Sequence, residues 1–555
     1  MRYYNFILSC PVFLGSLYLY VKQLKNYFLI FLFIFGSQLF GGVDYSVIGD
    51  STKNPATVNL LLTKTFYEKS HKIGFQSRYF FMNTNNYAIA SSDFYANGLN
   101  NSLSYRSANL LYLLNKLKEN PPPFSSLTIQ VEYSHLSNLS SSNFSTNNRY
   151  EIGLFDIKQP SLKSMGQITD LNVTGKFKKI EFQLGRFIPQ NPFINAQDGR
   201  LRPTYIQGAR LTYGHDFLPL RLNLIASLGI ANQFLVRGSN EWSSINQSVG
   251  IYPIGVNTIG KAVSYLNSVN SNNLLFFPSL HISKSNETYI GTIATFIDSI
   301  KLSKATENSL NYNLVYLNSL FTTHLVELKG SLQINRKIHR FRGSYGLIYT
   351  KYTSFSYGLM WIHQNSIAPI SEINYIDYQA NSNVFSALFS LRKHDLSWDY
   401  QITAAATRIT KDGRYLMPRE WGRDPFYTFM PRERNEGFGD LTALTLEAKI
   451  DRSFYPNFIN LKRLSFTLGC GNYQLPDVKD YFFNKYGMPS YQQLNTILNF
   501  QFAQNKNPHN LSIQLWYVQK FNSGNTYNQL NYELNKVNML QINIIVNYYY
   551  LITYK

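Results

Sequence analysis

Four arginines and one aspartate lie close together in a part of the chain that is rich in proline and glycine. They are Arg186, Asp198, Arg200, Arg202 and Arg210. A guanidinium group stays charged at physiological pH and presents a planar fork of N–H donors that fits a carboxylate. These residues therefore have the chemistry to bind small anions. Asp198 would either hold the arginine side chains in place or oppose their positive charge. The alternative is an exposed loop whose charges contact only water or lipopolysaccharide.

A second arginine-rich segment lies further along the chain, at residues 419–440. Its arginines are Arg419, Arg423, Arg432 and Arg434, and five carboxylate side chains stand among them. These arginines could make secondary contacts with a solute from a long loop. Because opposite charges this close in sequence readily pair with one another, ion pairs that order the loop are at least as good an explanation.

Residues with catalytic or metal-binding chemistry do not form a recognisable set. The sequence has no GxSxG, P-loop or HExxH motif. The nine histidines are scattered, and those beside lysine or arginine are interpreted as solvated. The two cysteines, Cys10 and Cys470, cannot build a disulfide framework or a cysteine-based metal site. We therefore expect no catalytic residues, no metal, no cofactor and no enzyme activity. The alternative is a hydrolase whose active site lies at the rim of a barrel.

Long stretches of alternating apolar and polar residues indicate the elements that carry these side chains. A membrane-spanning strand needs about 9–11 residues with a two-residue period, because successive side chains face lipid and water. Windows of this kind are spread over the chain: Leu127–Tyr133, Leu220–Ile230, Val326–Ile334, Leu444–Ile450 and Leu464–Cys470. No segment after the N-terminal region has about 18 consecutive apolar residues, the minimum for a spanning helix. The chain is therefore expected to cross a membrane as strands.

The clearest of these windows ends the chain. From Leu540 to Tyr554 every second residue is apolar or aromatic, and Gln541, Asn543 and Asn547 lie on the other face. Bacterial outer-membrane barrels commonly end on such a strand, and this one resembles their assembly signal. We therefore expect it to be recognised by barrel-assembly machinery. The last residue is lysine rather than phenylalanine, which is a small departure.

Composition agrees with a barrel rather than with soluble domains. Aromatic residues make up 16% of the chain and charged residues only 15%, against roughly 25% charged residues in soluble domains. Tyrosine is abundant, and it suits a membrane interface because its ring lies among acyl chains while its hydroxyl reaches the headgroups. The net charge is +20, but no run of five or more lysines and arginines occurs, so nucleic acid is not expected as a partner. Contacts with anionic lipids or passage of anionic solutes explain the basic charge better.

Residues 1–42 are expected to be a leader that contains a secretory signal peptide. The apolar stretch Tyr27–Phe35 follows Lys22 and Lys25 and precedes small residues, which places cleavage near residues 40–43. The earlier apolar stretch, at residues 6–20, would be explained by a translation start downstream of the first methionine; a membrane-anchoring helix is the alternative. Residues 43–555 show no sharp change in composition and are expected to form one barrel domain.

The segment Leu184–Tyr213 resembles the OprD family of outer-membrane porins. That family has a similar order of features: a strand ending in Leu-Gly-Arg, a proline-containing loop, an acidic residue before Arg-Leu-x-Pro, and a glycine leading into the next strand. The matching residues are Leu184, Gly185, Arg186, Asp198, Arg200, Leu201, Pro203 and Gly208. The segment Arg419–Asp440 is similar to a block found in more divergent relatives from Bacteroidetes.

This resemblance implies an all-β fold, a transmembrane antiparallel β-barrel with an early loop that folds inward and narrows the pore. It implies about 18 strands, and the chain length, at about 28 residues for each strand and its connection, allows 18 or 16. It also implies uptake of small solutes, often amino acids, peptides or aromatic carboxylates, guided by arginines along the lumen.

The sequence thus predicts a porin in the outer membrane of a Gram-negative bacterium. It would be a passive diffusion channel for small solutes, anionic or zwitterionic, with no energy coupling. Its expected partners are outer-membrane lipids, lipopolysaccharide, the assembly machinery and the solutes, with the barrel a monomer or a homotrimer. Besides the rim-active hydrolase, a structural or adhesive barrel with a closed lumen stays open as an alternative.

Overall fold

The computed structural model describes residues between Ser70 and Thr553. The main gaps in that range lie at 87–93, 112–125, 142–163, 197–200, 246–252, 257–261, 265–273, 369–377, 418–420, 504–509 and 524–536, with shorter gaps elsewhere. The leader predicted at residues 1–42 lies outside the described residues. The same is true of four candidate site residues, which are Asp198, Arg200, Arg419 and Arg434.

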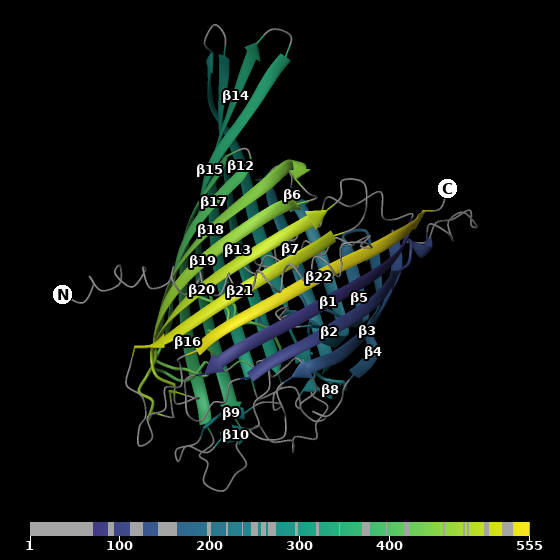
Figure 1. Ribbon diagram of the computed structural model, residues 1–555, viewed down its shortest axis with the longest axis vertical. Coiled ribbons are helices and arrows are strands. Elements are labelled where there is room, and N and C mark those ends of the chain that lie inside the picture. Colours follow the sequence, from purple (N-terminus) through teal and green to yellow (C-terminus); the bar gives the residue numbers. More distant parts are fainter. Residues whose placement is uncertain are drawn as a thin grey trace, which may run out of the picture. The chain divides into compact units, whose positions relative to one another are not determined.

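Eighteen long strands form the wall of a barrel (Figure 1). The first nine are β1 Ser70–Asn86, β2 Phe94–Arg106, β3 Ser126–Ser141, β4 Ser164–Phe177, β5 Ile180–Phe187, β6 Tyr205–Phe217, β7 Leu222–Leu235, β12 Ser279–Ala294 and β13 Asp298–Leu317. The other nine are β14 Phe321–Arg342, β15 Tyr345–Ala368, β16 Tyr378–Asp395, β17 Trp398–Ile409, β18 Leu441–Phe458, β19 Leu461–Gln474, β20 Tyr491–Ala503, β21 Asn510–Asn522 and β22 Val537–Thr553.

Four short strands lie in the connection between β7 and β12. They are β8 Ser243–Ser244, β9 Pro253–Val256, β10 Ala262–Ser264 and β11 Leu275–Phe276. β8 and β11 extend the wall beside β7, whereas β9 and β10 pair with each other in a separate hairpin.

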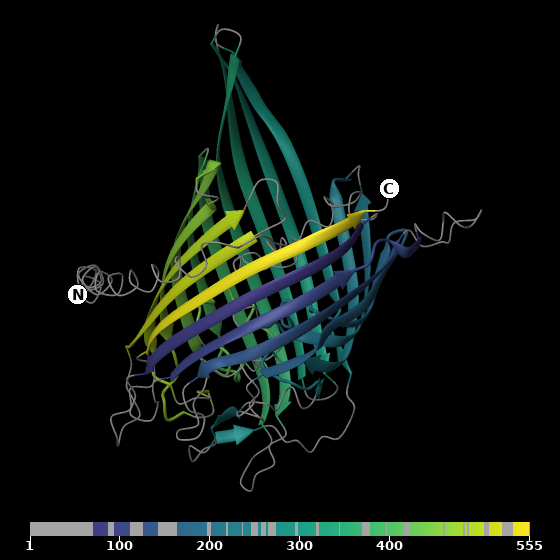
Figure 2. The ribbon, with the colours of Figure 1, turned by 45° about the vertical axis from the view of Figure 1, so that its right-hand side comes forward.

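The wall is a closed antiparallel sheet. Each long strand pairs with the next one along the chain, and β12 takes the place after β7. The first and last strands then pair from Ser70↔Thr553 to Asn86↔Val537, which closes the sheet (Figure 2). Closure satisfies the backbone hydrogen bonds at what would otherwise be two sheet edges, as a bilayer requires. The structure confirms the all-β barrel and the larger of the two expected strand counts, 18.

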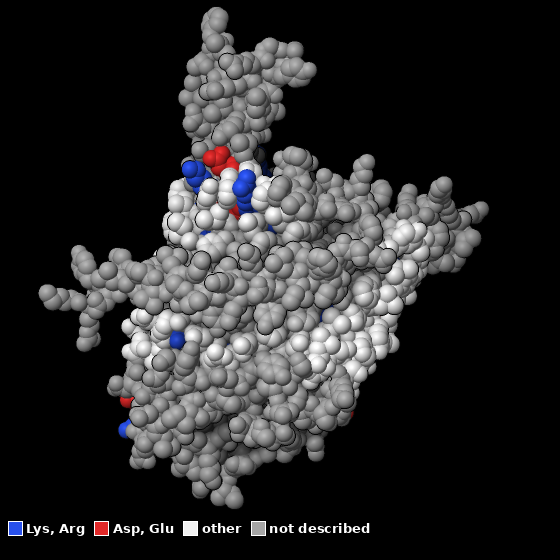
Figure 3. All heavy atoms as spheres, in the orientation of Figure 1, with Lys and Arg blue, Asp and Glu red and all other residues white. Residues whose placement is uncertain are grey.

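Side chains alternate between the two faces of the wall, as the two-residue period predicted. On β22, Tyr550 and Ile552 are 59% and 44% exposed, whereas Gln541 and Asn543 are 1% and 2% exposed. The buried set faces the lumen, where Asn543 Oδ1 accepts a hydrogen bond from Arg78 Nε at 2.9 Å. The exposed set belongs to an outward apolar surface, and Figure 3 shows the described outer surface mostly uncharged between its edges.

The two ends of the barrel differ in the length of their connections. At the end where β1 begins and β22 ends, here called the short-turn end, most connections between neighbouring strands are short, such as the turn Lys178–Lys179 between β4 and β5. At the other end, here called the long-loop end, the connections include residues 188–204, 236–278 and 410–440. Outer-membrane barrels carry short turns on the periplasmic side and longer loops outside. In the part of the chain that the structure describes, we find no helix with the length and apolarity of a membrane span.

Candidate functional site

The β5–β6 loop, residues 188–204, folds into the lumen. Phe193 and Ile194 are 1% and 0% exposed and pack in an apolar cluster with residues of β7 and of β13–β20. Leu201 is also 1% exposed, but it packs in a second apolar cluster, with residues of β1–β4, β21 and β22. The main-chain oxygen of Leu201 accepts a hydrogen bond from Asn100 Nδ2 at 3.1 Å. The loop therefore contacts two separate groups of wall strands, and it is the inward loop that the family resemblance implies.

The β17–β18 loop, residues 410–440, also enters the lumen. Trp421 is fully buried, and its ring stacks on Phe234 of β7 with centroids 5.3 Å apart and planes 4° from parallel. Further along, the Tyr427 hydroxyl donates to Glu327 Oε1 of β14 at 2.6 Å. The loop thus starts at the end of β17 but contacts β7 and β14, which lie elsewhere in the barrel wall.

The second half of this loop is bound to the opposite wall strands. The Tyr473 hydroxyl of β19 donates to the Thr428 main-chain oxygen at 2.9 Å. The Pro431 main-chain oxygen accepts hydrogen bonds from the side-chain amides of two β20 residues, Gln493 and Asn495. Arg432 Nη2 lies 3.4 Å from Thr84 Oγ1 of β1. These contacts extend the loop across the barrel from β7 and β14 to β20 and β1.

The two loops are bonded to each other through Asn195. Its main-chain N–H donates to the Trp421 oxygen at 2.9 Å. Its side chain makes two more bonds: Nδ2 donates to the Arg423 main-chain oxygen at 3.2 Å, and Oδ1 accepts from the Arg423 N–H at 3.0 Å. We call this arrangement the loop junction. The narrowing of the lumen is therefore a joint structure of the two loops.

Two of the predicted arginines occupy different surroundings on neighbouring strands. Arg210 of β6 donates through Nη1 to Gln190 Oε1, a side chain of the inward loop, at 2.9 Å. Arg186 of β5 donates through Nε to Gln207 Oε1 at 3.1 Å, and its guanidinium lies 4.7 Å from the centre of the Trp242 ring. Arg210 therefore lies at the constriction, whereas the contacts of Arg186 tie the β5–β6 ladder to the loop that follows β7.

Arg202 is fully buried, so its side chain does not form part of a pore surface. It donates through Nη2 to the Ser239 main-chain oxygen and is attracted electrostatically to Glu132. Glu132 Oε1 accepts hydrogen bonds from the Tyr205 hydroxyl at 2.8 Å and from Thr169 Oγ1 at 3.2 Å. This buried polar cluster holds the end of the inward loop against β3, β4 and β6.

The described arginines of the second segment contact the loop itself and the wall. The Arg423 guanidinium lies 5.1 Å from the centre of the Phe429 ring, and the Arg423 main chain forms the loop junction. Arg432 has a positive φ of 70° and reaches Thr84 of β1. Both arginines therefore help to hold the β17–β18 loop in its place across the lumen.

Charged side chains line the inner wall of β16–β19 toward the short-turn end. Arg392 donates through Nε to the two carboxylate oxygens of Asp399, at 2.8 and 2.9 Å. Asp451 is shared between Arg463 and Lys449, with Lys449 Nζ 3.6 Å from its Oδ2. The adjacent residues along these strands, such as Leu391, Tyr400 and Ile450, are exposed on the outer face. Because successive side chains point to opposite faces, the charged side chains point into the lumen. This part of the lumen wall therefore carries fixed charges of both signs.

Two tyrosines of the β17–β18 loop stay protonated across the physiological pH range. Burial raises the pKa of the Tyr415 hydroxyl well above its usual value, and the negative charges of Asp424 and Glu436 add to this. Burial also raises the pKa of Tyr427, as does its carboxylate partner Glu327. Both phenols therefore remain neutral, and Tyr427 keeps its proton for the bond to the wall.

Sequence reasoning missed the residues that join and anchor the loops. Asn195, Trp421 and Tyr427 lie outside the alternating windows, where the two-residue period gives no information. Trp421 and Tyr427 lie in the arginine-rich segment at residues 419–440, where aromatic residues among the charged ones are the signal that could have found them. Within the described ranges, His, Cys, Asp and Glu form no group of three or more that could hold a metal ion.

The fold and the loops define a class: an 18-stranded antiparallel barrel of the outer-membrane porin type, narrowed by two inward loops. No protein-family model matches the sequence, and no curated protein matches it. Among solved structures, OccAB3 of Acinetobacter baumannii superposes with a TM-score of 0.55 at 12% identity, covering 86% of this chain and 99% of the other. OccK9 (OpdG) of Pseudomonas aeruginosa gives 0.52 at 12% identity, covering 87% and 98%.

A third similar structure is that of OpdK from Pseudomonas aeruginosa with vanillate. Its TM-score is 0.51 at 11% identity, and the match covers 87% of this chain and 99% of the other. These neighbours are porins of the OprD and Occ group, which are not enzymes. At such low identity the likeness shows a shared fold, and at that level it confirms the resemblance expected from Leu184–Tyr213.

Proposed function

We propose that this chain is an outer-membrane porin, a passive diffusion channel for small solutes without a catalytic step, a cofactor or energy coupling. The observation that carries the proposal is the joint constriction, in which two inward loops are bonded through Asn195 inside a closed barrel. A barrel of about 16–18 strands leaves an aqueous channel when its lumen is not filled. Two loops that cross the lumen would reduce such a channel to a narrow, selective pore.

The charges near the constriction support a preference for anionic or zwitterionic solutes. Arg210 is bonded to the neutral amide of Gln190, and the one described carboxylate whose charge acts on it, Glu181, is itself paired with Lys176 Nζ at 2.9 Å. Farther along the lumen, one carboxylate, Asp451, is shared by Arg463 and Lys449. A fixed positive charge in a narrow pore lowers the cost of entry for an anion. Vanillate, the compound present in the OpdK structure, is an aromatic carboxylate and thus a member of the solute class that we propose.

The proposal includes an outer-membrane location and the partners that follow from it. Export would use the leader at residues 1–42, and the assembly machinery would recognise β22, whose aromatic outward face includes Tyr548 and Tyr550. The barrel would function as a monomer or a homotrimer. Asp198, Arg200, Arg419 and Arg434 stay candidates for solute contact on the strength of the sequence.

A structural or adhesive barrel with a closed lumen is the second candidate. The observation that favours it is the apolar packing of the loops, because Phe193, Ile194 and Trp421 are at most 1% exposed inside the barrel. Packing of this kind could seal the lumen instead of narrowing it. The polar and charged inner wall of β16–β19 favours the porin, because charged side chains suit a water-filled channel better than a sealed lumen.

Planar-bilayer recording on the full-length protein separates these two candidates. We expect small, discrete single-channel currents and a reversal potential that indicates anion preference in a salt gradient. A variant in which residues 416–436 are replaced by a short Gly-Ser linker should conduct far more, because the second loop no longer crosses the lumen. Absence of current in the unchanged protein, together with large currents in the loop variant, would overturn the porin in favour of the closed barrel. Cation preference would overturn the anionic solute class alone.

A further inference from the structure

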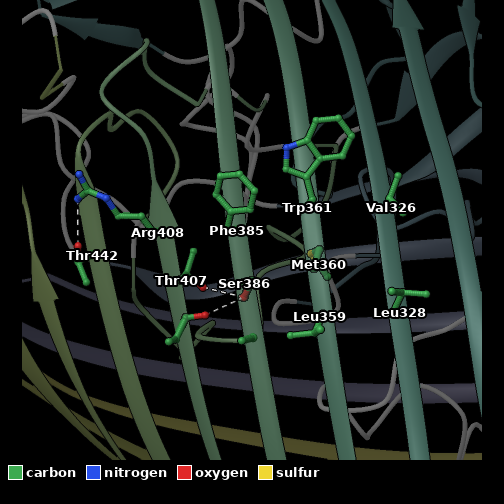
Figure 4. A pocket seen from close by; sticks show the side chains of 12 residues that line it. Val326, Leu328, Leu359, Met360, Trp361, Phe385, Ser386, Thr407, Arg408 and Thr442 are labelled. Carbon is green, nitrogen blue, oxygen red and sulfur yellow. Dashed lines mark hydrogen bonds between the residues drawn. The ribbon is translucent and has the colours of Figure 1, made fainter.

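A groove crosses the outer face of β14–β17, on the side of the wall away from the lumen. Its floor is formed by Ala387 and Ala406, which lie directly opposite each other on β16 and β17. Larger apolar side chains border it: Leu359, Trp361 and Phe385 are 52%, 37% and 51% exposed. The groove encloses about 510 Å³, and Figure 4 shows its lining side chains on adjacent strands.

Arg408 lies at the end of this groove nearest the long loops, one residue before β17 ends. Its side chain is 46% exposed and faces outward, in register with Phe385 on one side and Thr442 on the other. Nη1 donates to Thr442 Oγ1 at 3.0 Å (Figure 4), and Nη2 donates to Asp440 Oδ1. An arginine has five N–H donors. These two bonds therefore orient the guanidinium and leave donors for another acceptor.

The position of the groove determines what can fill it. Outward apolar faces of a membrane barrel contact acyl chains, and aromatic residues such as Trp361 mark the level of the headgroups. An arginine at this level extends its charged end toward phosphates, which it binds as charge-assisted acceptors. The long-loop end faces the outside of the cell. There the outer leaflet is made of lipopolysaccharide, in which phosphates are carried directly beside several acyl chains.

We propose that this groove is a binding site for lipopolysaccharide. One acyl chain lies over Ala387 and Ala406, and a lipid A phosphate accepts hydrogen bonds from Arg408. Asp440 lowers the net positive charge, but it also holds the guanidinium in one orientation on the outer face. A second copy of the chain could cover the apolar floor as well, yet it would make no use of an outward arginine at the rim. The site rests on the outer-membrane location proposed above and is independent of whether the lumen conducts.

The test measures lipid bound to the purified full-length barrel by mass spectrometry of the intact complex. The probes are bisphosphorylated lipid A, its dephosphorylated form and phosphatidylglycerol, each added after detergent delipidation. Two variants change the site: Arg408→Gln removes the charge, and Ala387→Leu fills the floor. Two matched controls lie outside it. Ala404→Leu changes an outward alanine of β17, the strand that carries Ala406 and Arg408. Arg452→Gln changes an arginine that lies over the Trp398 ring at the other end of the barrel.

We expect lipid A to bind the unchanged protein and both controls equally, and to bind Arg408→Gln about tenfold more weakly, the factor for one charge-assisted hydrogen bond. The dephosphorylated lipid should lose as much affinity for the unchanged protein, and Ala387→Leu should weaken both lipids. Equal binding of lipid A to all variants would overturn the site. Equal binding of phosphatidylglycerol and lipid A would overturn its identity. Dissociation of an oligomer in Ala387→Leu, with lipid A binding unchanged, would assign the groove to a second copy.

Conductance of the same variants keeps this inference separate from the proposed function. The altered side chains lie on the outer face, so pore currents should be unchanged while lipid binding falls. Intact anion currents with no lipid A binding would overturn only the lipid site. Lipid A binding without any current would overturn only the porin. Retention of the heat-resistant folded form on electrophoresis would verify that each variant has folded.

Discussion

The side-chain amide of Asn195 is hydrogen-bonded through both of its polar atoms to the main chain of Arg423. Oδ1 accepts from the Arg423 N–H at 3.0 Å, and Nδ2 donates to the Arg423 oxygen at 3.2 Å. The two residues are 228 positions apart in the sequence, on different loops. The side-chain amide thus bonds the N–H and the oxygen of one residue, as a paired strand does. These bonds link the two loops, which together form one constriction.

The first prediction concerns this loop junction. Asn195→Ala removes both side-chain bonds and leaves two main-chain groups of Arg423 without these partners, at a cost of about 1–3 kcal/mol. We expect the loops to separate more often, which should raise single-channel conductance and weaken ion selectivity. Asn223→Ala is the matched control, because Asn223 bonds Asp216 near the tight β6–β7 turn. Equal conductance in Asn195→Ala and the unchanged protein would show that the junction does not set the pore width.

The second prediction concerns charge at the constriction. Arg210→Gln removes a positive charge that contacts Gln190 of the inward loop, so the reversal potential in a salt gradient should shift toward cation preference. Arg210→Lys keeps the charge and should stay close to the unchanged protein. Arg452→Gln, on the outward rim, controls for a general change in net charge. The role of Arg210 in ion selection would be rejected if the glutamine and lysine variants had the same reversal potential.

The third prediction separates Arg202 from Arg210. Because Arg202 is fully buried beside Glu132, Arg202→Ala leaves a buried carboxylate without its positive partner and should destabilise the barrel by about 3–5 kcal/mol. The measurement is the temperature at which the folded form is lost on electrophoresis. The double variant with Glu132→Gln should recover part of the loss, because the carboxylate that Arg202 compensates is then a neutral amide. A change in ion selectivity without any loss of stability would instead place Arg202 at the pore surface.

The fourth prediction concerns pH. The pKa of Tyr427 is raised above its ordinary value of 10.0 when the loop is docked, because the phenol is buried and bonded to Glu327. The stability that this group contributes to docking is therefore fully present below a pH of about 10 and is lost as the pH rises above it. Conductance should be constant from pH about 5 to 9 and should increase above about 10.

Tyr427→Phe tests the source of this response. The variant has no phenol to ionise, so its rise in conductance above pH about 10 should be smaller. It should also start from a higher conductance at neutral pH, because Glu327 loses one of its hydrogen-bond donors. The same alkaline rise in Tyr427→Phe and in the unchanged protein would assign the effect to another group.

The wall of the barrel could be predicted from the sequence because its signal is local. The alternation from Leu540 to Ile552 corresponds residue by residue to the outward and lumen faces of β22, and the interruption after Leu184–Arg186 falls where β5 ends at Phe187. Neighbouring strands repeat the same period, so the pattern was sufficient to predict the fold class. The pattern left the number of strands at 16 or 18, because the number depends on the lengths of the individual strands and connections.

The interior could not be predicted in the same way. Arg202 and Arg210 are only eight positions apart and looked equivalent as pore arginines, yet one is fully buried and the other lies at the constriction. Asn195 carried no sign that it would bond Arg423. Such contacts depend on where barrel closure brings distant loops, and no local period records that.

By itself, therefore, the sequence determined a membrane-type β-barrel fold and the stretch of chain at which the wall breaks into an inward loop, since lipid and water impose the two-residue period on the strands. Only the tertiary structure decided that two loops share the constriction, that Arg210 is near it while Arg202 is buried, and that an arginine-bordered groove crosses the outer wall. These features join residues far apart in the chain, which become neighbours only when the sheet closes and the loops pack inside it.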